Sequence, residues 1–174
     1  GTVKPLIGAK AGLHGSFRLS DALDLYIEPV FMATKAPGLG GTGWTPEVRV
    51  MAGLSYKLGR EASFSDHSVY ESPLEGLSNF VSLSGGPTFF SGNFHNRRVN
   101  GAFDLSVGRW FTLVSGLRAG ITYDFVPNEN KWRRLNMGSV HADYLLNMTS
   151  LVTRDAMRRF HIIGVLGGGV SFSD

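Results

Sequence analysis

Polar and apolar residues alternate along the stretch KAGLHGSFRLSDALDLYIEPV, from Lys10 to Val30, and this alternation limits the folds open to the chain. Lys10, His14 and Arg18 occupy even positions, and the odd positions between them hold apolar residues or glycine. Side chains of a β-strand point alternately to its two faces, so the pattern predicts strands with one polar and one apolar face. A tight turn at Ser20–Ala22 divides the stretch into two such strands.

The same alternation recurs along the chain and predicts eight strands, with no convincing helix. The expected strands cover residues 3–19, 23–35, 44–58, 78–91, 98–111, 113–126, 134–148 and 158–172, with a long linker at 59–77. Thr149–Ala156 is expected to be a plain loop, and Pro29 is expected to cause a bulge or kink because proline lacks a ladder donor. The length of 174 residues suits one domain, an all-β antiparallel up-and-down barrel over residues 1–174.

Two kinds of barrel fit this pattern. A soluble lipocalin-like barrel turns its apolar face inward, whereas an outer-membrane barrel turns it outward to lipid. Charged residues make up only 18% of the chain, against about 25% in ordinary soluble domains. The apolar face carries aromatic residues near strand ends, as at membrane interfaces: Trp44, Tyr56, Phe111, Tyr123 and Phe125. We therefore expect a transmembrane β-barrel of the bacterial outer membrane.

The polar face carries both charge signs, interspersed with glycine, serine and threonine. Small residues and balanced charges suit the narrow lumen of an eight-stranded barrel, and buried polar groups must find partners. The expected lumen network comprises Lys10, His14, Arg18, Asp24, Glu28, Glu47, Arg49, Lys57, Asp104, Arg118, Asp124, His141, Asp143, Arg159 and His161. A lumen plugged in this way predicts little or no ion conductance.

The histidines also raise the hypothesis of a lipid-modifying outer-membrane enzyme. His141 and Asp143 share a face roughly 6.5 Å apart along their strand. A catalytic triad needs its base within about 3 Å of a nucleophile, and this spacing does not select one. We favour mutual pairing of polar side chains and expect no catalytic residue.

No cofactor or metal is expected. The chain has no cysteine, and its histidines lack a recognisable ligand spacing. The segment GLGGTG at Gly38–Gly43 precedes an expected strand, whereas a dinucleotide-binding loop must open a helix.

Two basic clusters fall on loops expected outside the membrane, since outer-membrane barrels keep their short turns on the periplasmic side. One contains Arg97 and Arg98, and the other contains Lys131, Arg133 and Arg134. Arginine binds phosphate through paired hydrogen bonds, so contact with lipopolysaccharide is one hypothesis and ordinary solvated loop ends are the other. A net charge of only +3 argues against a nucleic-acid partner.

Four stretches together resemble the OmpA-like outer-membrane barrels of Bacteroidota: GSFRLSDALDLYIE (Gly15–Glu28), VGRWFTLVSGLRAGI (Val107–Ile121), HADYLLNMTSL (His141–Leu151) and RRFHIIGVLGGGV (Arg158–Val170). In that family the stretch like GRWF…GLR comes early and the stretch like FRLSDALDL comes late, the reverse of the order here. The chain is thus expected to be a permuted barrel or a piece of a tandem repeat, whose strands would be part of a larger wall or of two barrels. The resemblance implies a non-enzymatic barrel among outer-membrane lipids, serving as envelope structure or as a subunit with other outer-membrane proteins.

Overall fold

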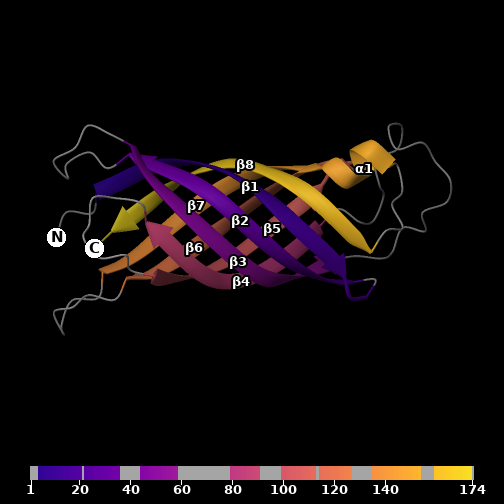
Figure 1. The fold of residues 1–174 in the computed structure, drawn as a ribbon, viewed down its shortest axis with the longest axis horizontal. Helices are drawn as coiled ribbons and strands as arrows, with labels where there is room; N and C mark the ends of the chain where they lie inside the picture. The colour runs from indigo at the N-terminus through magenta and orange to yellow at the C-terminus, as the bar shows by residue number, and fades with distance from the viewer. Residues whose placement is uncertain are drawn as a thin grey trace.

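The computed structural model describes residues 4–20, 22–35, 44–58, 79–90, 99–112, 114–126, 135–153 and 159–173. It contains eight strands and one short helix (Figure 1): β1 (Lys4–Arg18), β2 (Leu23–Lys35), β3 (Trp44–Leu58), β4 (Asn79–Phe90), β5 (Val99–Trp110), β6 (Ser115–Val126), β7 (Leu135–Asn147), α1 (Met148–Thr153) and β8 (Phe160–Ser173). Outside the described residues lie Gly38–Gly43, the linker at 59–77, and the basic clusters Arg97, Arg98, Lys131, Arg133 and Arg134.

The strands form one closed barrel. Each strand pairs antiparallel with the next in sequence, and β8 pairs with β1, from Lys4 opposite Ser173 to Phe17 opposite Phe160. The predicted all-β up-and-down barrel of eight strands is confirmed. Because β1 and β8 are paired with each other, neither is an open edge that could continue into a larger wall.

The barrel has two distinct ends (Figure 1). At the turn end, Leu19 and Ser20 donate to the Leu23 carbonyl at 2.9 and 3.0 Å, which closes the β1–β2 turn. The Thr112 hydroxyl accepts from the Ser115 amide at 2.9 Å in the β5–β6 turn at the same end. The Ser20 hydroxyl likewise accepts from the Leu23 amide at 3.1 Å, as serine and threonine side chains commonly do in tight turns. The opposite end, where Lys4 and Ser173 pair, is the terminal end.

The helix α1 corrects the prediction that the segment after β7 is a plain loop. The Asn147 side-chain oxygen accepts from the Ser150 amide at 3.1 Å, which is the hydrogen bond of a helix N-cap. The Thr149 hydroxyl accepts from the Ile162 amide at 2.8 Å and joins the helix to β8. A helix of six residues is too short to reveal a helical period in the sequence. No helix in the part of the chain that the structure describes is long and apolar enough to cross a bilayer.

The bulge expected at Pro29 is not formed. Pro29 pairs with Val50 in an unbroken β2–β3 ladder. On the β1 side, the register is the same before and after the proline, with Gly12 opposite Val30 and Gly15 opposite Ile27. Pairing between β1 and β2 is interrupted only opposite Pro29 and Glu28, so the missing donor is accommodated locally without a shift of the strands.

Candidate functional site

An apolar belt surrounds the outside of the barrel. All eight strands contribute exposed large apolar side chains, among them Ile7, Ile27, Leu54, Leu83, Leu105, Ile121, Val140 and Leu166. Tyrosines aside, the outward-facing polar side chains among those described are confined to strand ends: Lys35, Asn79, Arg109 and Ser115. The middle of the outer surface therefore presents no charge and no amide in the described strands.

The height of the belt follows from β1, where outward side chains are apolar or glycine from Ile7 to Phe17. These ten steps cover about 33 Å at about 3.3 Å per residue. A strand tilt of about 40° reduces this to about 25 Å along the barrel axis.

Aromatic side chains occupy both margins of the belt. Trp44 and Tyr56, near the two ends of β3, are 56% and 53% exposed. Tyr123 and Phe125 pack edge to face at 4.7 Å on β6 near the terminal end. Phe111 lies in the β5–β6 turn and is also exposed. The aromatic residues named from the sequence thus all lie outside the barrel.

The centre of the lumen is held by Arg118, which reaches from β6 to β2 on the opposite wall. Its guanidinium donates two parallel hydrogen bonds to the Glu28 carboxylate, both at 2.8 Å. It also donates to Asp143 on β7 from Nε and Nη2, at 2.9 and 2.8 Å. All three side chains are almost fully buried, so each charge depends on these partners rather than on water.

His141 connects this centre to β5. Its Nε2 lies 2.6 Å from Asp104 Oδ2, and its Nδ1 lies 3.1 Å from Asp143 Oδ2. Lys10 Nζ approaches the same Nδ1 at 3.0 Å and Asp143 Oδ2 at 2.8 Å. His14 Nδ1 lies 2.7 Å from Glu28, so three strands besides β2 and β6, namely β1, β5 and β7, contribute to one ionic cluster.

A second ionic group lies nearer the terminal end. Arg49 Nη2 on β3 is 2.9 Å from Glu47 and 2.9 Å from Asp124 on β6. Two carboxylates therefore share one guanidinium nitrogen, and all three residues are buried. At the turn end, Lys57 pairs with Asp24 at 3.1 Å and is less buried.

Three other predicted lumen residues lie outside these groups. Arg18 faces inward opposite Asp24 in the register, and its buried Nε has no hydrogen-bond partner among the described residues. His161 also faces inward and is half-buried. The prediction for Arg159 was wrong, because this residue precedes β8 and its side chain is exposed, apart from the buried ionic groups.

Inward-facing glycines create the room that the charged side chains occupy. A methyl group on Gly167 would overlap Asp143 Oδ1 and approach the Ala142 carbonyl at 2.6 Å. A methyl group on Gly120 would lie 2.8 Å from His141 Nε2. The inward-facing glycines thus leave the space that the ionic cluster needs, because an eight-stranded barrel has little spare interior.

The sequence interpretation missed an apolar plug inside the lumen towards the turn end. Phe80, Leu145, Ile163 and Val165 pack together there, with Trp110 against them. The signal was present in the apolar doublets Leu145-Leu146, Ile162-Ile163 and Val165-Leu166. Where two neighbouring residues of a strand are both apolar, one must point inward.

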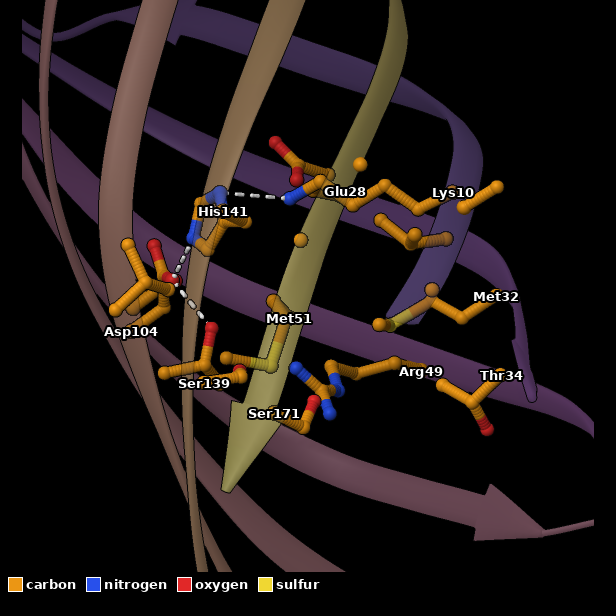
Figure 2. A pocket seen from close by; sticks show the side chains of 18 residues that line it. Lys10, Glu28, Met32, Thr34, Arg49, Met51, Asp104, Ser139, His141 and Ser171 are labelled. Carbon is orange, nitrogen blue, oxygen red and sulfur yellow. Dashed lines mark hydrogen bonds and ion pairs between the residues drawn. The ribbon is translucent and has the colours of Figure 1, made fainter. Parts of the chain in front are cut away.

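A cavity of about 30 Å³ remains between the central cluster and Arg49 (Figure 2). Lys10 reaches across to His141 on one side, and Met32, Met51 and Arg49 line the other. Since one water needs roughly 10–15 Å³ of such space, the cavity has room for water and not for an organic ligand.

The reactions that this interior could catalyse are limited, because the ring nitrogens of His141 are already in contact with charged side chains. Both ring nitrogens of His141 contact Asp104, Asp143 or Lys10, and among the described residues neither contacts a serine or threonine hydroxyl. A nucleophile activated by histidine requires such a contact. The described residues also include no group of three or more histidines or carboxylates arranged to hold a metal ion.

Comparisons with protein-family models, with curated proteins and with solved structures find no match to this chain.

Proposed function

We propose that the chain is an integral β-barrel of the bacterial outer membrane, with a structural role in the envelope or as a subunit of an outer-membrane complex. The observation that carries the proposal is the inverted distribution of polarity. Large apolar side chains cover the outside of every strand, while Glu28, Arg118 and Asp143 are buried inside. Membrane barrels have this arrangement, and soluble barrels have the reverse.

The belt dimensions support the same proposal. A height of about 25 Å matches the lipid-facing band of known outer-membrane barrels. Aromatic residues at its margins, such as Trp44 and Phe125, fit the interfaces between lipid and water. The resemblance to OmpA-like barrels agrees with this compartment.

The packing of the lumen supports the proposal that the barrel does not conduct ions and has no catalytic residue. Arg118 bridges opposite walls at the centre. The apolar plug of Phe80, Leu145, Ile163 and Val165 fills the lumen towards the turn end. Water and ions would have to pass both barriers. The engaged nitrogens of His141 favour this role over that of a lipid-modifying enzyme.

One substitution in the middle of the belt tests the proposal. We expect Leu105→Arg to lower the free energy of unfolding in lipid vesicles by about 2–4 kcal/mol, because a charge there would face hydrocarbon. Arg109→Lys at the belt margin is the matched control and should change stability by less than about 0.5 kcal/mol. The wild-type chain should require detergent for extraction from membranes. Two results together would favour the soluble barrel: the wild-type protein is released from membranes without detergent, and the Leu105→Arg variant is at least as stable as the wild type.

Contact with lipopolysaccharide belongs to the same proposal. Reversing the charges of Arg97, Arg98, Arg133 and Arg134 together should reduce the lipopolysaccharide that copurifies with the protein, because phosphates bind guanidinium groups. Unchanged lipopolysaccharide content in the folded variant would reject this contact without affecting the rest of the proposal.

A further inference from the structure

The helix α1 presents an apolar face to its surroundings. Thr149 and Ser150 lie on the barrel side, where Ser150 is 2% exposed and Thr149 accepts from Ile162. Leu151 and Val152 occupy the opposite side and are 44% and 80% exposed. Val152 is the most exposed large apolar side chain that the structure describes. A helix that leaves such side chains in water forgoes their burial, so their placement points to an apolar surrounding.

The strands next to α1 carry the apolar belt down to the turn end. On β8, Phe160 and Ile162 face outward and are 51% and 40% exposed. Met148 lies on the same outer side, since a methyl group on Gly164 would be 3.9 Å from its Cε.

Other strands end differently. The outermost residues of β4, β5 and β6 at the turn end include Asn79, Arg109 and Ser115. Polar residues therefore close the belt on that side, whereas next to β7 and β8 the helix continues it.

We propose that α1 lies in the boundary layer between headgroups and acyl chains, with Leu151 and Val152 directed into the lipid. This inference rests on the proposed function and adds a second membrane contact beyond the strands. Short amphipathic segments bind membranes by placing one apolar face in this layer. The exposed Arg159, next to Phe160 at the same edge, supplies a cation at the level of the lipid phosphates.

Spin labels test this directly, because the chain contains no native cysteine. We would label Val152→Cys and Leu151→Cys, with Leu105→Cys as a mid-belt reference and Lys35→Cys as a reference at the opposite margin. Each variant is refolded into vesicles of phosphatidylethanolamine and phosphatidylglycerol. Relaxation by oxygen, which concentrates in lipid, is compared with relaxation by a water-soluble nickel chelate. Circular dichroism establishes that each labelled variant keeps the strand content of the wild type.

The expected result is a depth of roughly 5–10 Å below the headgroups for the labels at 151 and 152. The Leu105→Cys label should be deeper, and the Lys35→Cys label should be reached readily by nickel. If the 151 and 152 labels are as accessible to nickel as the label at 35 while the label at 105 lies in lipid, α1 is in water and only this inference fails. If the label at 105 is also in water, the membrane barrel itself is rejected.

Discussion

At the scale of single residues, stability depends on how charge is neutralised inside the lumen. Arg118 holds Glu28 and Asp143 at once, so its removal would leave two buried carboxylates short of a partner. Breaking a buried ion pair by deleting one member costs far more than the pair contributes when intact.

We expect Arg118→Leu to lower the free energy of unfolding by about 3–5 kcal/mol. Urea unfolding of the refolded barrel, followed by tryptophan fluorescence, measures the loss. The matched control is Arg109→Leu, which removes an exposed outward arginine and should cost less than about 0.5 kcal/mol. Equal losses of unfolding free energy in the two variants would mean that Arg118 in the central cluster contributes no more to stability than an exposed arginine does.

A second prediction follows from the close packing of Gly167 against Asp143 in the central cluster. Gly167→Ala should cost about 1–3 kcal/mol, because its methyl group has no space beside Asp143. Gly101→Ala is the control, since a methyl group there meets nothing within 4 Å. A Gly167→Ala barrel as stable as the Gly101→Ala barrel in the same urea titration would show that β8 can move away from Asp143.

At the scale of elements, α1 depends on one capping side chain. Asn147→Ala should remove the hydrogen bond to the Ser150 amide and destabilise the helix by about 1 kcal/mol. Hydrogen exchange at Ser150 should then be about fivefold faster, the factor that corresponds to such a loss. Asn147→Asp keeps a capping oxygen and should retain most of the protection. Unchanged exchange in Asn147→Ala would show that the link from Thr149 to Ile162 alone holds the helix.

Sequence alternation predicted the strands well because a period of two records the environment of each face directly. Each observed strand ends within two residues of its expected bounds, for example 79–90 against 78–91. The pattern also identified Glu28, Arg118 and Asp143 as inward-facing. It could not show that Arg118 spans the lumen to Glu28, because which strands face each other depends on closure and stagger of the barrel. Arg159 was misplaced because alternation has no meaning beyond the strand end.

At the scale of the whole molecule, the lumen should be impermeable. Reconstitution into a planar bilayer should give no stable single-channel steps, because the Arg118 bridge and the apolar plug block the path in series. An open porin reconstituted in parallel controls for insertion. Recurrent steps of fixed size from this chain would contradict a closed lumen and would require the ionic cluster to open.

The pairing of β1 with β8 has a further consequence for how the barrel folds. Of the eight strands, Lys4–Arg18 comes first in sequence and Phe160–Ser173 comes last, so the barrel cannot close until all eight strands are available to pair. An incomplete chain carries two unpaired strand edges, which are sites for aggregation. Contacts this distant in sequence also form slowly. Both edges therefore stay unpaired until β8, which is fourteen residues long, pairs with β1.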